Sequence, residues 1–108
     1  MNGVPPPGEG KAQISLIDLP SELEAGAFIT GLIKIKNIGE ATDDLRLLVI
    51  PEWTDVQYGR DAQVAVGGTL AVSIIEGLLV MPDKDAIIVM KGQHLEDGVW
   101  ITDDEKSH

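Results

Sequence analysis

The residues of this chain best suited to chemistry are carboxylates in short clusters, at residues 43–44, 83–85 and 103–105. Carboxylate oxygens are the ligands that Ca²⁺ prefers, and loops at one end of a β-fold can bring such clusters together. None of the clusters follows the spacing of an EF-hand loop, and adjacent carboxylates in turns commonly stay solvated and cap local backbone groups. We therefore expect no dedicated metal site and no cofactor, and the weak candidates for Ca²⁺ are Asp103, Asp104 and Glu105.

Residues for acid–base or nucleophilic catalysis form no recognisable set. Glu52 and Glu76 could act as a glycosidase pair, but one sequence gives no distance between them. His94 precedes an expected turn and should be exposed, and the only other histidine, His108, is the last residue. No serine or threonine lies in a nucleophile elbow, and the absence of cysteine excludes thiolate catalysis, disulfides and thiolate metal sites. The sequence predicts a protein that is not an enzyme.

Aromatic side chains are the remaining candidates for recognition. Indole and phenol rings supply binding energy toward proteins and sugars, so Trp100, Trp53 and Tyr58 are the candidate binding residues. By strand phase Trp53 continues an inward-facing set and is expected in the core, whereas Trp100 suits the core or the surface equally.

Charge narrows the possible partners. The chain has 18 acidic and 8 basic residues and a net charge of -10, which opposes contact with nucleic acid because phosphate binding needs a positive surface. The excess of acidic residues is most simply explained by solubility, and the alternative explanation is an acidic binding face. No apolar run approaches the roughly 18 residues of a membrane helix, so we expect no membrane insertion.

The chain of 108 residues has room for one domain. Residues 1–11 begin MNGVPPPGEG and predict a flexible leader rich in proline and glycine, with a polyproline ligand as the sharper alternative. Residues 12–108 are expected to form the folded domain.

A period of two is the clearest structural signal in that domain. From Phe28 to Lys36, isoleucines occupy one face and mostly polar residues the other, which predicts a half-buried strand. Similar alternation occurs in later runs. The side chains expected to be buried on these apolar faces are Ile29, Ile33, Ile35, Leu47, Val49, Leu70, Val72 and Ile74.

Turn signals separate the apolar runs. In residues 37–40 (NIGE), Gly39 can take a positive φ and Asn37 can bond the local backbone, while Asp97-Gly98 is typical of a hairpin turn. Pro51 cannot donate to a sheet ladder, so it should mark an edge or a bulge. Residues 86–91 are apolar on both faces, which predicts a central strand. The expected strands cover about residues 13–19, 28–36, 45–53, 63–66, 70–74, 86–91 and 99–102, the pattern of an all-β sandwich of about seven short strands.

The stretch FITGLIKIKNIGEATDDLRLLVI, followed by VAVGGTLAVSI, resembles the immunoglobulin-like domains of the bacterial cell-adhesion-related (CARDB) group. The matching pieces are Ile35, Asn37, Gly39 and the turn at residues 67–69. The later MPDKDAIIVMKGQHLEDGVWITDDEK is similar to the closing hairpin of such domains. The resemblance implies an immunoglobulin-like β-sandwich serving as a module of a larger surface, secreted or virion assembly, and it implies no catalytic residue.

Two functions follow as hypotheses. The first is a structural or protein-interaction module, with a protein partner or a second copy joined through a sheet edge, outside the cytoplasm or in a virion. The second is a carbohydrate-binding module that uses exposed tryptophan. Residues 103–108 look too polar and short for another core strand, so we expect an open edge near the C-terminus, unless residues 63–66 or the first strand already cover it.

Overall fold

The computed structural model describes residues 8–80 and 86–108, which form seven strands and no helix. The predictions for residues 1–7 and 81–85, including the proline run and the acidic pair at 83 and 85, lie outside the described residues. The strands are β1 (Ala12–Asp18), β2 (Phe28–Asn37), β3 (Asp43–Pro51), β4 (Tyr58–Val64), β5 (Thr69–Leu79), β6 (Ile88–Glu96) and β7 (Val99–Ser107).

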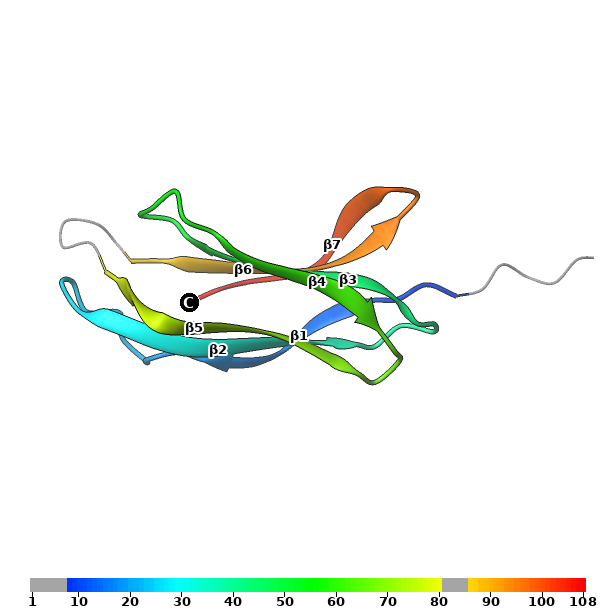
Figure 1. The fold of residues 1–108 in the computed structure, drawn as a ribbon, viewed down its shortest axis with the longest axis horizontal. Helices are drawn as coiled ribbons and strands as arrows, with labels where there is room; N and C mark the ends of the chain where they lie inside the picture. The colour runs from blue at the N-terminus through cyan, green and yellow to red at the C-terminus, as the bar shows by residue number, and fades with distance from the viewer. Residues whose placement is uncertain (1–7, 81–85) are drawn as a thin grey trace, which may run out of the picture.

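The strands pack as two antiparallel sheets face to face, in the orders β1-β2-β5 and β4-β3-β6-β7. Figure 1 shows the two layers and the long axis that the strands share. The segment before β1 enters at the end that carries the β6–β7 turn, and the C-terminus lies toward the opposite end of the strands (Figure 1). The predicted all-β sandwich is confirmed.

The core lies between the sheets and is aliphatic. All eight side chains predicted to be buried are buried, so that part of the sequence analysis is confirmed. Alternation decides this, because every second residue of a strand points to the same face and the apolar set must face the other sheet. The further members of the core are Ala12, Ile14, Leu45, Val64, Leu78, Val80, Ile88 and Met90.

The observed bounds of β4 and β7 differ from the predicted ones, because polar residues in these strands also pair with the neighbouring strand. β4 spans Tyr58–Val64 and not residues 63–66, because it pairs along β3 with only Val64 fully buried. β7 runs from Val99 to Ser107, so the polar tail continues the last predicted strand, and among the described residues no further strand follows it. An edge strand needs only one paired neighbour and can expose polar side chains, so a low apolar content does not end it.

Pro51 ends an internal strand and does not lie on an edge strand. β3 is paired on both sides, but its pairing with β4 stops at Val49 and Tyr58, whereas Pro51 still pairs with Ile88 of β6. The missing N–H of proline therefore falls beyond the end of β4. Among the described residues no helix has the length and apolar character to cross a membrane.

Candidate functional site

A bulge in the β6–β7 hairpin places two consecutive carboxylates on one side of the sheet. The hairpin turns at Asp97 and Gly98, whose φ values of 51° and 78° match the positive values of a type I′ turn, as predicted for an Asp-Gly pair. Gly92 pairs with Asp104 and Gln93 with Thr102, so Asp103 is the extra residue. The bulge lets Asp103 and Asp104 both turn toward β1.

These two carboxylates cap the outer edge of β1. Oδ2 of Asp103 accepts the N–H of Ala12 at 2.9 Å, and Oδ2 of Asp104 accepts the N–H of Ile14 at 2.9 Å. An edge strand otherwise presents unpaired backbone donors to other chains. Side chains of β7 thus cap two backbone donors on the edge of β1. Among the described residues β7 itself pairs with β6 alone, so the open edge expected near the C-terminus stays a prediction.

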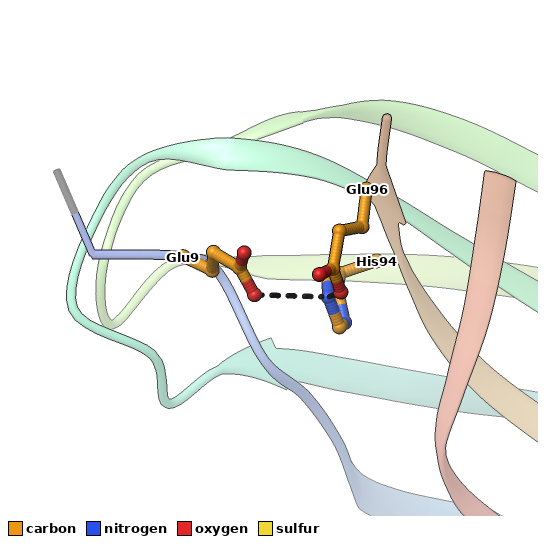
Figure 2. Close-up of side chains that lie close together, drawn as sticks. All are labelled: Glu9, His94 and Glu96. Atoms are coloured by element: carbon orange, nitrogen blue, oxygen red, sulfur yellow. Dashed lines mark hydrogen bonds and ion pairs between the residues drawn. The ribbon is translucent and has the colours of Figure 1, made fainter. Parts of the chain in front are cut away.

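His94 lies behind these carboxylates and is only 6% exposed, so the expectation of an exposed histidine is wrong. Its Nδ1 lies 2.7 and 2.8 Å from the two carboxylate oxygens of Asp103. Its Nε2 lies 3.3 Å from Oε2 of Glu96 and 3.6 Å from Oε2 of Glu9. Figure 2 shows the Glu9 carboxylate directed at the imidazole. The ring lies on the inward face of β6, between Asp103 of β7 and Glu9 of the segment before β1.

The pKa of His94 is raised above its ordinary value of 6.5. Burial of the ring lowers this pKa, but the hydrogen bond and negative charge of Asp103 act in the opposite direction, together with Glu96 and the charge of Asp43. The net effect favours a positive charge on the imidazole.

The segment before β1 is bound to the sandwich through its backbone. The N–H of Gly10 donates to Oδ2 of Asp43 at 2.9 Å, and the N–H of Glu40 donates to the carbonyl of Glu9 at 2.9 Å. A side chain at Gly39 would fall against the backbone of residues 9–11. Gly39 is therefore needed for close approach and not for a positive φ, which corrects the predicted role of this glycine.

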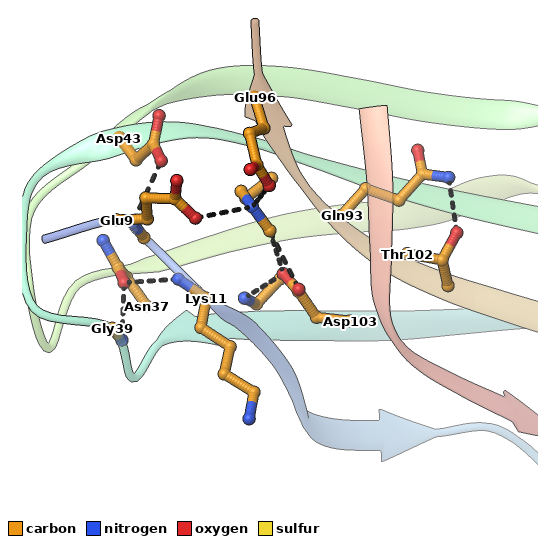
Figure 3. A network of polar contacts seen from close by, with 12 residues as sticks. Glu9, Lys11, Asn37, Gly39, Asp43, Gln93, Glu96, Thr102 and Asp103 are labelled. Atoms are coloured by element: carbon orange, nitrogen blue, oxygen red, sulfur yellow. Dashed lines mark hydrogen bonds and ion pairs between the residues drawn. The ribbon is translucent and has the colours of Figure 1, made fainter. Parts of the chain in front are cut away.

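The side chain of Asn37 forms hydrogen bonds to the same segment and to the loop after β2, as Figure 3 shows in part. It is fully buried, and its Oδ1 accepts the N–H of Gly39 at 2.9 Å and the N–H of Lys11 at 3.2 Å. Its Nδ2 donates to the carbonyls of Ala41 at 3.0 Å and Val64 at 2.9 Å. The local backbone bonding predicted for Asn37 is confirmed, and the side chain also joins β2 to β4 and to the segment before β1.

The three aromatic candidates do not share one surface. Trp100 is half-buried on the outer face of the hairpin, with the Arg46 guanidinium carbon 4.6 Å from its ring centroid. Trp53 follows β3 at the other end of that sheet, packs partly against the core and donates from Nε1 to the carbonyl of Leu79 at 2.8 Å. Tyr58 starts β4 and is also half-buried against the core.

The predicted Ca²⁺ candidates have different partners. Asp103 and Asp104 face β1, whereas Glu105 lies 3.6 Å from Nζ of Lys91. Glu52 and Glu76, which were considered as a glycosidase pair, are both exposed.

The cluster formed by Glu9, His94 and Glu96, supported by Asp103, was missed by the sequence analysis. One signal was available, because residues i and i+2 of a strand share a face and the pair His94 and Glu96 has that spacing. Glu9 gave no signal, since only the tertiary fold carries it to β6. A buried imidazole among carboxylates can hold a proton or a metal ion.

No protein family, curated protein or solved structure matched this chain when it was compared with each of the three.

Proposed function

We propose that the chain is a non-enzymatic structural or protein-interaction module, whose copies meet end to end in a larger surface, secreted or virion assembly. The observation that carries the proposal is a group of large apolar side chains left in water at one end of the three-stranded sheet. Phe28 is 73% exposed, Ile75 80% and Leu79 41%.

These three residues lie toward the same end of the paired strands β2 and β5. Phe28 starts β2 and pairs with Leu79, which ends β5. Ile75 stands at the start of an irregular stretch of β5, and Gly77 in that stretch lies beside the Phe28 side chain. Contiguous exposed apolar surface on a soluble domain is typical of an interaction site. β5 is also an edge strand, where another chain can approach the backbone.

The opposite end of the sandwich also exposes apolar side chains. We therefore propose that the partner bound at the Phe28 end is a second copy of this chain. Val99 and Ile101, at the start of β7, are 58% and 38% exposed. A contact between unlike ends of identical chains is heterologous and extends into a row. Because the chain carries a net charge of -10, copies repel one another, and salt should strengthen the association by screening that repulsion.

The strand order supports an immunoglobulin-like assignment. The first, second and fifth strands share one sheet and the third, sixth and seventh share the other, as in seven-stranded immunoglobulin domains of the constant type. The fourth strand departs from that type, since β4 joins β3 and not β5. Such domains serve many functions, so this assignment supports a module without specifying its partner.

Sedimentation velocity over a range of protein concentrations, at low and high ionic strength, tests the proposal. We expect concentration-dependent association that grows with salt and is lost in the double variant Phe28→Ser, Ile75→Ser. Leu16→Ser is the matched control, because Leu16 is 39% exposed on β1, away from both ends. A monomer under every condition, or a double variant that associates like the parent, would overturn it.

The carbohydrate-binding alternative has weaker support. A sugar ring stacks on a free aromatic face, but Arg46 lies over Trp100 and the Trp53 indole is already bonded to Leu79. Quenching of tryptophan fluorescence by a panel of neutral oligosaccharides would favour this alternative over the structural one.

A further inference from the structure

We propose that Glu9, His94 and Glu96 form a binding site for a divalent transition metal ion, with Zn²⁺ as the best match, and that Asp103 orients the imidazole. The zinc site and the end-to-end association use different side chains, although Glu96 and His94 pair across the hairpin with Val99 and Ile101 of the second apolar surface.

The first step is the tautomer of His94. Nδ1 lies 2.7 Å from Oδ2 of Asp103, which is the length of a strong charge-assisted hydrogen bond, so Nδ1 carries a hydrogen. Oδ2 of Asp103 also accepts the N–H of Ala12, so this carboxylate is held in place from two sides. Metal-binding histidines commonly donate their second ring N–H to a carboxylate in this way.

The second step is the environment of Nε2. In the neutral ring with hydrogen on Nδ1, Nε2 carries a lone pair, and it faces two carboxylates that also offer only lone pairs. Three acceptors converge on one point, and a cation there resolves their repulsion. A proton on Nε2 could form only a weak hydrogen bond to one of the two carboxylates. The distances from Nε2 to Glu96 and Glu9, 3.3 and 3.6 Å, are both longer than the 2.7–2.9 Å of a good N⁺–H···O⁻ bond.

The third step is the spacing of the donors. Ligands about 2.0–2.2 Å from a tetrahedral Zn²⁺ lie roughly 3.4 Å from one another. The distances from Nε2 to the two glutamate oxygens, 3.3 and 3.6 Å, bracket that value, and the three donor atoms all lie within 4.8 Å of each other. A movement of the exposed Glu9 side chain would complete the set. An imidazole ligand favours Zn²⁺ over Ca²⁺ and Mg²⁺, which prefer oxygen alone.

The surroundings support a cation. Besides the two glutamates, Asp103 and Asp43 add negative charge near the ring, and among the described residues no lysine or arginine forms an ion pair with any of these four carboxylates. The site opens to a surface pocket lined in part by Glu9, His94 and Asp103, so an ion can enter. The polar contacts around it are drawn in Figure 3.

Isothermal titration of untagged, metal-free protein with ZnCl₂, and with CaCl₂ for comparison, tests the site. We expect one Zn²⁺ per chain, no Ca²⁺ binding, and a shift of the His94 Nε2 resonance in ¹⁵N NMR. Loss of a residue that hydrogen-bonds to a metal ligand commonly lowers metal affinity by about tenfold or more, and loss of a ligand itself should lower it at least as much. Glu9→Gln and Glu96→Gln should therefore each weaken Zn²⁺ binding by about tenfold or more. Glu9 is exposed, which makes Glu9→Gln safe for folding.

Two controls separate this site from chance binding. Glu40→Gln changes a carboxylate beside the same pocket, and His108→Asn removes the other histidine; both should leave the affinity unchanged. The absence of Zn²⁺ binding would overturn the proposal. So would binding that survives Glu9→Gln and Glu96→Gln, or binding that disappears in His108→Asn.

Discussion

Oδ2 of Asp103 lies 2.7 Å from Nδ1 of His94, and this contact ties the edge strand β7 to the buried face of β6. The same oxygen accepts the backbone N–H of Ala12, so one carboxylate joins three strands from both sheets. Its neighbour Asp104 repeats the capping two residues further along β1. At this side of the sandwich the two sheets are therefore joined by side-chain hydrogen bonds and not by a backbone ladder.

Replacing Asp103 by alanine should destabilise the fold. The change leaves the Ala12 N–H and the His94 Nδ1–H without their partner, and a buried unsatisfied donor costs about 1–3 kcal/mol. Urea unfolding in the presence of a chelator measures the loss. Glu105→Ala is the control, because within the described part of the chain Glu105 forms one exposed ion pair, with Lys91, and such pairs contribute about 0–1 kcal/mol. Equal effects of the two substitutions would contradict this account.

Stability of the metal-free protein should depend on pH through His94. Its folded pKa is raised above 6.5, so the charged ring stabilises the fold fully below pH 6.5, and this stabilisation is lost as pH rises through the folded pKa. The melting temperature in chelator should therefore fall across that window. The acidic groups that face the ring are Glu9, Glu96, Asp103 and Asp43. His94→Gln should flatten the profile, and an unchanged slope in this variant would assign the effect to other groups.

Gly39→Ala should displace the segment before β1. The new methyl group would fall against the carbonyl of Glu9 and the amide of Lys11, so the backbone must move, at a cost of at least about 1 kcal/mol. Zn²⁺ binding should weaken with it, because Glu9 belongs to that segment. Gly59→Ala serves as the comparison, since its added methyl would lie 3.1 Å from the flexible end of Leu48 and at an ordinary contact distance of 3.9 Å from the Leu47 carbonyl. Thermal unfolding and zinc titration of both variants provide the check.

Asn37→Ala should be among the most destabilising single changes at this end of the molecule. It leaves four backbone groups without their partner, and a loss of about 2–4 kcal/mol is expected from buried groups of this kind. Ser15→Ala, which removes one exposed hydrogen bond at 3.4 Å, should be nearly neutral. Chemical denaturation distinguishes the two, and a neutral Asn37→Ala would show that water replaces these bonds.

The zinc proposal predicts a change in stability as well as in binding. An ion that binds only the folded state stabilises it, so Zn²⁺ should raise the melting temperature of the parent protein, and chelator should reverse the rise. Ca²⁺ should have no effect. Differential scanning fluorimetry of the parent and of Glu9→Gln measures both effects, and a rise of the same size in the variant would argue against Glu9 as a ligand.

The sequence by itself determined the fold class and the core. Ile33, Ile35, Leu47 and Val72 lie in runs whose large apolar residues recur at every second position, and this alternation is a local property that assigns each side chain to a face without knowledge of the partner strand. The Asp97-Gly98 turn was equally predictable, because positive φ is a property of the turn residues themselves.

Only the tertiary structure decided where polar side chains meet. From its place before a turn His94 is expected to be exposed, yet the bulge at Asp103 and the segment at residues 8–11 bury it. Glu9 and Glu96 are far apart in the chain, and their approach depends on how one sheet lies on the other. Local periodicity assigns a residue to a face, but the packing of the sheets determines which faces and edges come together, and polar clusters between strands arise from that packing.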